Sequence, residues 1–199
     1  MKRIGLLGGT FDPPHIGHLW LAQTAFEQLQ LDTVLFLPVG CPPHKLNQPV
    51  SAVSHRLAMV QLAIAANPAF QLDTTDLKRP PPHTTVTLLP HIHTAYPKTN
   101  LWLLAGSDSL HDLPAWEEPH RLITQCRLAI LPRPGVTVNW TELETAVPNI
   151  KMTVDMLTGP TVTLSSTTVR QWAASGKSIQ YLVNTAVWQY MQKHQLYAP

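Results

Sequence analysis

Short apolar runs without polar alternation recur along this chain, and segments of helical period separate them. Such runs occur at residues 4–7, 33–39, 101–105 and 127–131, with weaker ones at 70–73 and 150–156. A strand with one face in water alternates apolar and polar residues, so these runs indicate strands buried on both faces. The chain is therefore restricted to folds that cover both faces of a sheet.

Apolar side chains recur at helical spacing in residues 19–29, 54–66 and 85–96, the last of which contains Pro90. Strands that alternate with helices form parallel sheets through right-handed crossovers. The sequence thus predicts the α/β class, with a Rossmann-like doubly wound parallel sheet and helices on both faces. Ligands of such folds bind beyond the carboxyl ends of the strands, so we expect functional residues in the loops that follow strands.

Composition excludes several classes of protein. The chain has 199 residues, 44% of them apolar, and a formal net charge of +2. This fits a single domain over residues 1–199, with a C-terminal helical part from about residue 160. The small charge excess argues against nucleic-acid or membrane partners. The N-terminal apolar stretch is too short for a signal peptide, and Cys41 and Cys126 have no ligand-pair spacing, so we expect a cytoplasmic protein.

The loop between the first strand and the first helix carries the strongest chemical signal. Two glycines predict a tight turn that brings backbone amides close to an anion. Two histidines follow at the helix start, three positions apart, where unpaired N–H groups also favour an anion. The imidazoles would donate to phosphate oxygens and add positive charge when protonated. The predicted triphosphate site comprises Gly8, Gly9, Thr10, Phe11, His15 and His18.

Three other interpretations of this loop are weaker. A zinc site would need a third Cys or His at a recognisable distance. A dinucleotide site would need a G-x-G-x-x-G sequence, which the loop lacks. A glycine turn with incidental histidines does not explain why both histidines lie at the helix start.

A second helix start, near the C-terminus, has the residue types of an anion site. Ser165, Ser166 and Thr167 offer a helix cap, hydroxyls and amides. Arg170, one turn later, would meet the same phosphates. Taken alone, the segment is equally well explained as an N-cap followed by a surface arginine.

Together these segments resemble a known family. Residues 8–18 match the G-x-F-D-x-x-H-x-G-H signature of the nucleotidyltransferase superfamily, and residues 164–170 are similar to its I-S-S-T-x-I-R motif. The P-P-H-K sequence at residues 42–45 looks like that of nicotinate-nucleotide adenylyltransferases, and this resemblance covers nearly the whole chain. It implies that His15 and His18 bind nucleotide phosphates, and that a nucleotidyl group is transferred with release of pyrophosphate.

The resemblance implies roles for further residues. Gly106 and Asp108, in a segment similar to the family's G-x-D-S-L, belong to the ATP side, although Asp108 is also a plausible helix N-cap. Trp116 would stack on a pyridine ring, with a core position as the alternative. The residues implied to bind the mononucleotide are Lys45, Arg56, Thr85, Trp116 and Arg133; a solvated position is the alternative for Lys45 and Arg56. Residues 83–89 depart from the family, since His83 and Thr84 replace a usual serine and tyrosine.

The implied reaction is adenylyl transfer from ATP to nicotinate mononucleotide, giving deamido-NAD and pyrophosphate. The mononucleotide phosphate is already a nucleophile, so the protein must chiefly align two anions and absorb charge. The residues predicted to do so are His15, His18, Lys45 and Arg170. We expect Mg²⁺ to arrive with ATP, because no carboxylate cluster suggests a metal site in the protein.

Several other functions are compatible with the sequence. The acceptor could be nicotinamide mononucleotide, or both mononucleotides. A pantetheine-phosphate adenylyltransferase or a cytidylyltransferase would share the first motif. A nucleotide-sensing module that binds ATP without turnover is a different class, and a homo-oligomer is compatible with all of these.

Overall fold

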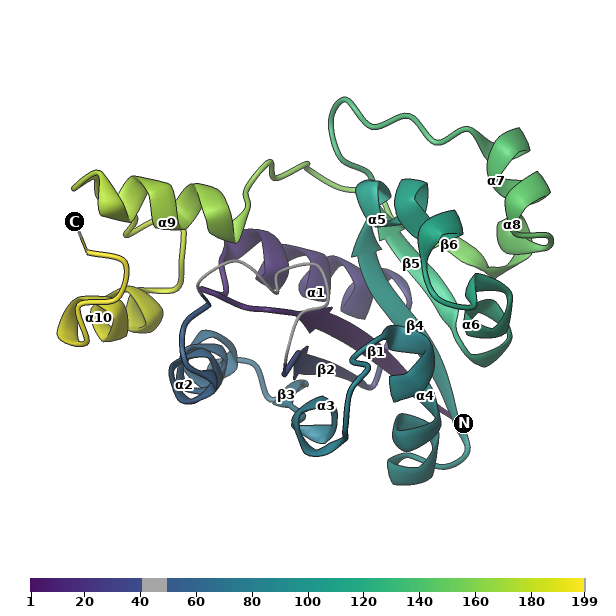
Figure 1. The fold of residues 1–199 in the computed structure, drawn as a ribbon, viewed down its shortest axis with the longest axis horizontal. Helices are drawn as coiled ribbons and strands as arrows, with labels where there is room; N and C mark the ends of the chain where they lie inside the picture. The colour runs from purple at the N-terminus through teal and green to yellow at the C-terminus, as the bar shows by residue number, and fades with distance from the viewer. Residues whose placement is uncertain (41–49, 199) are drawn as a thin grey trace.

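A six-stranded parallel sheet forms the centre of the structure, a computed structural model that describes residues 1–40 and 50–198 (Figure 1). The strand order is β3-β2-β1-β4-β5-β6, and each neighbouring pair is parallel. The order reverses between β1 and β4, which confirms the predicted doubly wound α/β sheet. The strands are β1 (Lys2–Gly9), β2 (Thr33–Pro38), β3 (Phe70–Leu72), β4 (Thr99–Gly106), β5 (Arg127–Leu131) and β6 (Val154–Met156).

Helices lie on both faces of this sheet, as predicted (Figure 1). Among residues 1–40 and 50–198, no helix is both long and apolar enough to cross a membrane. The longer helices are α1 (Ile16–Gln28), α2 (Val53–Ile64), α4 (Thr85–Ala95), α9 (Ser166–Ala174) and α10 (Thr185–Lys193). The shorter ones are α3 (Thr75–Lys78), α5 (Ser107–Asp112), the 3₁₀ helix η2 (Leu113–Ala115), α6 (Pro119–Gln125), α7 (Trp140–Ala146) and α8 (Ile150–Thr153).

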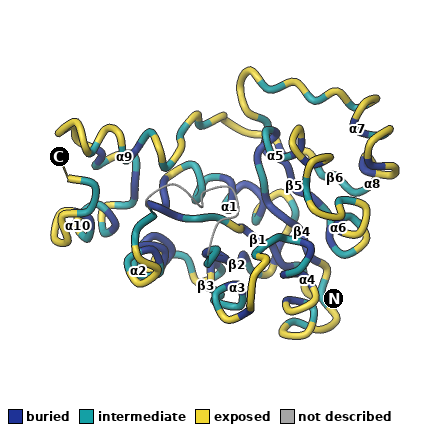
Figure 2. Tube along the Cα trace, in the orientation of Figure 1, coloured by how far each residue is buried: buried dark blue, intermediate teal, exposed yellow. Residues whose placement is uncertain are grey.

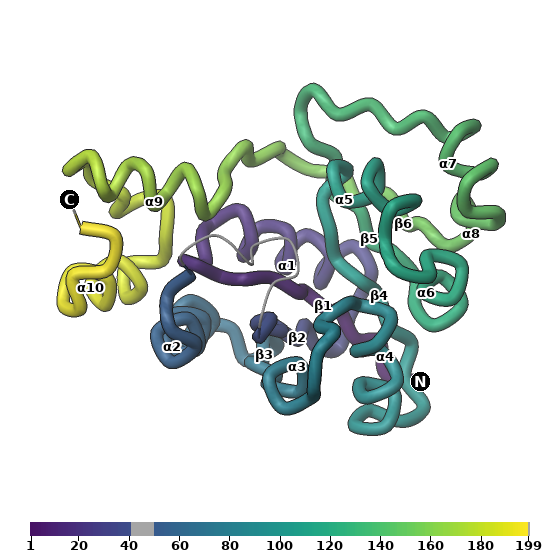
Figure 3. The backbone as a smooth tube through the Cα atoms, viewed as in Figure 1, coloured from purple at the N-terminus to yellow at the C-terminus, as the bar shows by residue number. Residues whose placement is uncertain are grey.

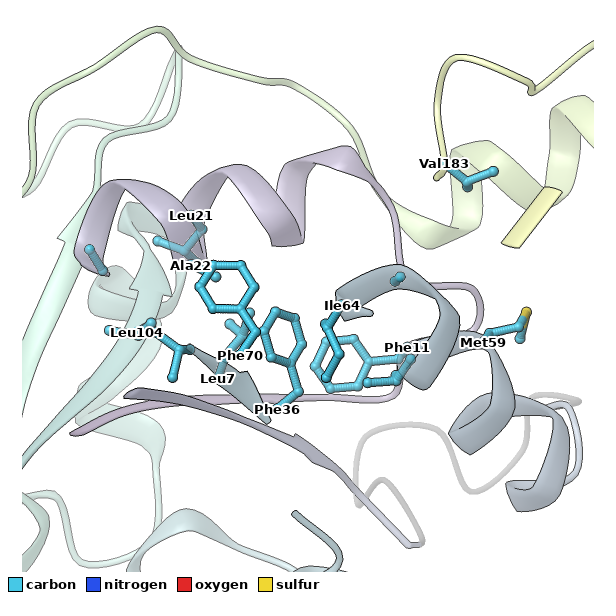
Figure 4. Close-up of a cluster of buried hydrophobic side chains, with 14 of the residues drawn as sticks. Leu7, Phe11, Leu21, Ala22, Phe36, Met59, Ile64, Phe70, Leu104 and Val183 are labelled. Atoms are coloured by element: carbon cyan, nitrogen blue, oxygen red, sulfur yellow. The ribbon is translucent and has the colours of Figure 1, made fainter. Parts of the chain in front are cut away.

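Two hydrophobic cores, one on each face of the sheet, hold the layers together. Along β2, Val34 and Phe36 enter one core while Leu35 and Leu37 enter the other, as the two-residue period of a strand requires. The first core, part of which Figure 4 shows, joins the sheet to α1, α2, α9 and α10. The second joins it to α4–α8. Because both faces are covered, the middle of the sheet is buried (Figure 2), which explains the strands' lack of polar alternation.

Residues 150–156 do not form the single strand expected of them. Helix α8 occupies the first part, and only β6 joins the sheet. The carboxylate of Glu144 accepts the backbone N–H groups of Asn149 at 2.8 Å and Lys151 at 3.2 Å. Asn149 itself has a left-handed φ of 70°. This contact with α7 turns the chain before β6, and the apolar pattern alone contains no sign of it.

Pro90 lies inside α4 without ending the helix. It is exposed, whereas Leu88, Leu89 and Ile92 are buried in the second core. The packing of this apolar face compensates for the backbone bond that proline cannot donate. The helix therefore spans nearly the whole of the predicted segment, and its N-terminus lies at the carboxyl edge of the sheet.

Candidate active site

The loop between β1 and α1 differs in one respect from the prediction. Gly8 and Gly9 end β1, paired with Leu37 and Pro38, so they extend the strand rather than forming a tight turn. The chain turns instead at Phe11, whose φ of 52° is uncommon for a residue with a side chain. The Phe11 ring is only 1% exposed, and its burial offsets the cost of this conformation.

The two histidines lie together at the start of α1, as predicted. His15 is the N-cap and His18 lies in the first turn, with ring centroids 3.7 Å apart. The backbone N–H of His15 donates to Nδ1 of His18 at 3.2 Å. Because Nδ1 accepts this bond, a neutral His18 carries its proton on Nε2, as a donor. Gly17 leaves room for the pair, since a Cβ there would lie 3.1 Å from Nδ1 of His15.

His15 is neutral near pH 7, which corrects the expectation that it adds positive charge. Its side chain is buried, and burial together with the positive charge of Arg133 lowers its pKa to about 4. Its Nδ1 is buried without a hydrogen-bond partner. His15 therefore offers a phosphate an uncharged imidazole rather than a cation.

The second predicted motif lies against this loop at the start of α9. Ser165 is the N-cap, as expected, and its Oγ accepts the backbone N–H of Thr168 at 3.1 Å. The hydroxyl of Ser166 donates to the carbonyl of Pro13 at 2.8 Å. The guanidinium of Arg170 donates to the carbonyl of Asp12 at 2.7 Å. Two segments about 150 residues apart in sequence are thus bonded directly to each other.

A cavity of about 180 Å³, here called the α1–α9 cavity, lies between the two motifs. It brings together most of the residues predicted to bind ATP, although the Arg170 side chain is committed to Asp12 and is not part of its lining. The lining residues are Thr10, Phe11, His15, His18, Arg133, Leu164, Ser165, Ser166 and Thr167.

A second cavity of about 270 Å³, here called the α4 cavity, adjoins the first along the carboxyl edge of the sheet. His18 and Arg133 line both cavities. The wall of the α4 cavity also contains Thr85 and Trp116, two residues predicted to contact the mononucleotide. The remaining wall contains three glycines, Gly8, Gly9 and Gly106, and the polar side chains of Asp76, His83, Thr84 and Ser109.

Sequence reasoning missed a charged network that supports the α4 cavity. Asp76 and Arg79 form a buried ion pair, with Arg79 Nη2 2.6 Å from Asp76 Oδ1 and both side chains 4% exposed. Arg79 also donates to the carbonyls of Pro82 and Thr84 and to the hydroxyl of Thr87. The sequence contains one sign of this network: Asp76 and Arg79 lie three positions apart, directly before a proline-rich segment.

His83, the departure from the family pattern, lies within this network. Its side chain is 8% exposed, and its Nδ1 lies 3.3 Å from Oδ2 of Asp76. The ring also packs against Gly40, where a Cβ would lie 3.1 Å from its Cε1. The departure thus places an imidazole in the wall of the α4 cavity, beside the N-terminus of α4.

The end of β4 positions Arg133 between the two cavities. The hydroxyl of Ser107 accepts the backbone N–H of Arg133 at 2.9 Å, and Nη1 of Arg133 lies 2.9 Å from Oδ2 of Asp108. Gly106 leaves room for this pair, because a Cβ would lie 2.4 Å from Oδ1 of Asp108 and 2.7 Å from Nε of Arg133 and would displace both side chains. Oδ1 of Asp108 has no hydrogen-bond partner and is left to accept from a ligand.

One predicted mononucleotide residue that the structure describes, Arg56, is not part of these walls. Arg56 is 1% exposed, and its guanidinium donates to the carbonyls of Thr10, Val39, Gly40 and Ser51. Its guanidinium therefore joins the loops after β1 and β2 to each other instead of presenting its charge to a ligand. Lys45 lies outside the described residues.

No group of three or more His, Cys, Asp or Glu side chains is placed to hold a metal ion in the part of the chain that the structure describes. The donors at the two cavities are mainly hydroxyls, imidazoles, backbone amides and one arginine. Such groups favour anions, phosphates in particular.

Comparison with known proteins agrees with this chemistry. Residues 6–172 match the family described as cytidylyltransferase-like. The chain is 42% identical over 197 residues to a probable nicotinate-nucleotide adenylyltransferase of Thermomicrobium roseum, an alignment that covers 99% of this chain and 92% of the relative. It is 39% identical over 194 residues to a protein of the same description from Roseiflexus, with 98% and 97% coverage.

The fold is also that of a solved structure. The nicotinic acid mononucleotide adenylyltransferase of Plasmodium falciparum, complexed with NaAD, superposes with a TM-score of 0.81 at 18% identity. The superposition covers 99% of this chain and 98% of the Plasmodium chain.

Proposed function

Since this chain belongs to the cytidylyltransferase-like family and matches nicotinate-nucleotide adenylyltransferases over nearly its full length, we propose that it transfers the adenylyl group of ATP to nicotinate mononucleotide. The products are deamido-NAD and pyrophosphate, a step of NAD biosynthesis. The α1–α9 cavity would hold the ATP phosphates, and the α4 cavity would hold the mononucleotide.

The observation that carries this proposal is the meeting of the two cavities at His18 and Arg133. Transfer between two phosphates requires both anions to approach within bonding distance, although they repel each other. A shared wall with an imidazole donor and a guanidinium is suited to that junction.

The chemistry needs no covalent intermediate. A phosphate oxygen of the mononucleotide attacks the α-phosphorus of ATP and forms a new P–O bond. The bond from the α-phosphorus to the α–β bridging oxygen breaks, and its electron pair leaves with pyrophosphate. The residues of this chain would bind, orient and stabilise charge during that exchange.

We assign the ATP side to the loop after β1 and the start of α9. His15 and His18 would donate to phosphate oxygens, and the amides and hydroxyls of Ser165, Ser166 and Thr167 would bind others. Asp108 would accept from a ribose hydroxyl through its unpartnered Oδ1. Since these segments bond to each other, we treat residues 1–199 as one nucleotidyltransferase domain.

We assign the mononucleotide to Trp116, Arg133 and the N-terminus of α4. Trp116 would stack on the pyridine ring, and Arg133 would bind the phosphate. Thr84, the N-cap of α4, makes no side-chain capping bond, so first-turn amides remain to bind the pyridine substituent. Lys45 is proposed as a further phosphate contact and Arg170 as an ATP contact. Arg56 is better suited to positioning the two loops that it joins.

Mg²⁺ is proposed to arrive bound to ATP. It is a hard cation that prefers oxygen ligands and is commonly held through substrate phosphates. The described residues do not form a protein cage for it. When bound, the ion supplies charge neutralisation on the phosphates.

Steady-state kinetics with the two mononucleotides, ATP and Mg²⁺ test the proposal. The first-turn amides of α4 bind a carboxylate more strongly than a neutral amide. A difference of ~1.4 kcal/mol is tenfold, so we expect at least a tenfold higher kcat/KM for nicotinate mononucleotide. Absence of pyrophosphate release with either acceptor would favour a nucleotide-sensing module instead.

Equal values for the two mononucleotides, or preference for the amide, would show that His83 has changed the pocket. The enzyme would then be a nicotinamide-mononucleotide or dual-specificity adenylyltransferase. His83→Ser, which restores the usual family residue, should in that case recover preference for the acid.

A further inference from the structure

The end of the chain returns to the loop that carries the two histidines. The hydroxyl of Tyr197 donates to Oδ1 of Asp12 and accepts a hydrogen bond from Oγ of Ser51 at 3.1 Å. The residues Asp12 and Tyr197 are 185 positions apart. Figure 3 shows this C-terminal end beside α9 and α10, and α10 packs on α2, which begins two residues after Ser51.

The tail is held in a defined conformation. Gln195 has a φ of 50° and Tyr197 a φ of 59°, both in the left-handed region that residues with side chains rarely adopt. Such conformations persist where surrounding contacts fix them. The hydroxyl bonds of Tyr197 are contacts of this kind, since they join the tail to two other segments.

Asp12 joins the C-terminal tail to the loop after β1 and to the start of α9. Its carboxylate is buried, with the residue 1% exposed, and Oδ2 accepts the backbone N–H of Ser51 at 3.3 Å. Its carbonyl accepts from Arg170 of the second motif. It lies three positions before His15, so its placement determines where the histidine pair begins.

The phenol of Tyr197 is a permanent donor to this carboxylate. Burial and the nearby Asp12 carboxylate raise its pKa well above the ordinary value, so the hydroxyl stays protonated throughout the neutral range. A buried carboxylate needs such donors, because an unsatisfied charge in the interior is costly. Removal of the hydroxyl would leave Asp12 with one donor fewer and free to shift.

We propose that Tyr197 is a positioning residue for adenylyl transfer, whose hydroxyl fixes Asp12 and thereby the loop that presents His15 and His18. The inference rests on the proposed function for its kinetic consequence. Tyr197 acts through the loop and contacts no substrate. A displacement of about 1 Å in a catalytic group is enough to reduce turnover by up to about a hundredfold.

Tyr190 provides a matched control. Its hydroxyl lies 2.9 Å from Nδ1 of His55 and joins α10 to α2, but it does not bond to the loop after β1. Tyr197→Phe and Tyr190→Phe therefore make the same chemical change, the loss of a phenol hydroxyl, at two different hydrogen bonds of the C-terminal region. Only the first change reaches Asp12.

The experiment compares both variants with the unaltered chain well below their thermal midpoints. We expect Tyr197→Phe to lower kcat roughly tenfold to a hundredfold, with little change in KM for either substrate, while Tyr190→Phe retains wild-type kcat. In a His18→Ala background the additional loss from Tyr197→Phe should largely disappear, because both changes affect one unit. Unchanged kcat, or an undiminished loss in that background, would overturn the proposal.

A second readout does not depend on activity. In ¹⁵N-labelled protein, Tyr197→Phe should shift the imidazole signals of His15 and His18, whereas Tyr190→Phe should shift those of His55. Unshifted His15 and His18 signals would overturn the positioning role of Tyr197, whether or not the unaltered chain is active. Inactivity of the unaltered chain would refute only the proposed function. If Tyr197→Phe does not fold, Ser51→Ala, which removes the other hydroxyl partner, must show the same signal shifts.

Discussion

The two ends of the candidate site are assembled in different ways. At the α1–α9 cavity, hydrogen bonds join Asp12 and Pro13 to Ser166, Arg170 and Tyr197, across 153 to 185 positions of sequence. At the α4 cavity, Arg79 makes its bonds to partners three to eight positions away. The bonds at the first end cross nearly the whole chain. The Arg79 network that supports the second end is local, although the cavity wall beside it also contains His18, Trp116 and Arg133.

The departure from the family pattern lies at the end with the local network. A local network can change several members together without disturbing distant segments, and His83 lies in such a network. Residues 8–18 are hydrogen-bonded to several separate parts of the chain, among them Ser51, Arg170 and Tyr197, so a change there would have to be matched in all of them.

The largest effect should come from breaking the local network. Arg79→Leu would leave the Asp76 carboxylate buried without its cation, which typically costs about 3–5 kcal/mol. For a chain of this size we expect the thermal midpoint to fall by on the order of 10 °C. At temperatures where the variant is folded, the KM for ATP should be unchanged, because the α1–α9 cavity is held by other bonds.

The Arg121–Glu118 pair is the control, since it has the same three-residue spacing but side chains 57% and 52% exposed. Arg121→Leu should cost less than about 1 kcal/mol. Similar midpoints for the two variants would mean that the buried network does not hold the α4 end.

His18→Ala should cause the largest loss of catalysis. His18 lines both cavities, where the proposed transfer would develop charge on the phosphate. Loss of one such donor typically reduces kcat ~10²–10³-fold, or about 3–4 kcal/mol. Steady-state kinetics should show this loss with a smaller change in KM for ATP, while the exposed control His120→Ala behaves as wild type. A raised KM with unchanged kcat would contradict the assignment.

The neutral state of His15 makes stability depend on pH. Its pKa falls from 6.5 to about 4 on folding, so between these values the unfolded chain binds a proton that the folded protein does not. Stability therefore falls as the pH is lowered, and this residue accounts for about 3 kcal/mol by pH 4. Urea unfolding at pH 7 and pH 4 should show a smaller decrease for His15→Gln than for wild type; equal decreases would mean that His15 titrates normally.

Trp116→Ala should give the smallest of these effects and confine it to one substrate. Stacking on a flat ring is worth roughly 1–3 kcal/mol, by analogy with bases on aromatic side chains. We expect the KM for the mononucleotide to rise roughly tenfold and the KM for ATP to remain the same. Trp172→Ala, which removes a 44% exposed tryptophan on α9, is the control. Equal losses for both substrates would indicate a core role for Trp116.

Much of the fold and part of the site were predictable because they depend on local patterns. Strand and helix periods involve neighbours a few positions apart, and they located five of the six strands. The spacing of His15 and His18 placed both on one side of α1, and the chemistry of Ser165 predicted its N-cap role. The order of the elements then placed the loops after β1, β2 and β4 at one edge.

Only the tertiary structure decided how those residues are held. The burial of Arg56, the carbonyl that Arg170 binds, the partner of Tyr197 and the low pKa of His15 all depend on atoms from other elements. A hydrogen bond or a desolvation effect is set by distances of a few ångströms, and sequence spacing carries no such information across long separations. The sequence by itself therefore determined which groups reach the carboxyl edge of the sheet, and packing determined their charge, their partners and their freedom to bind a ligand.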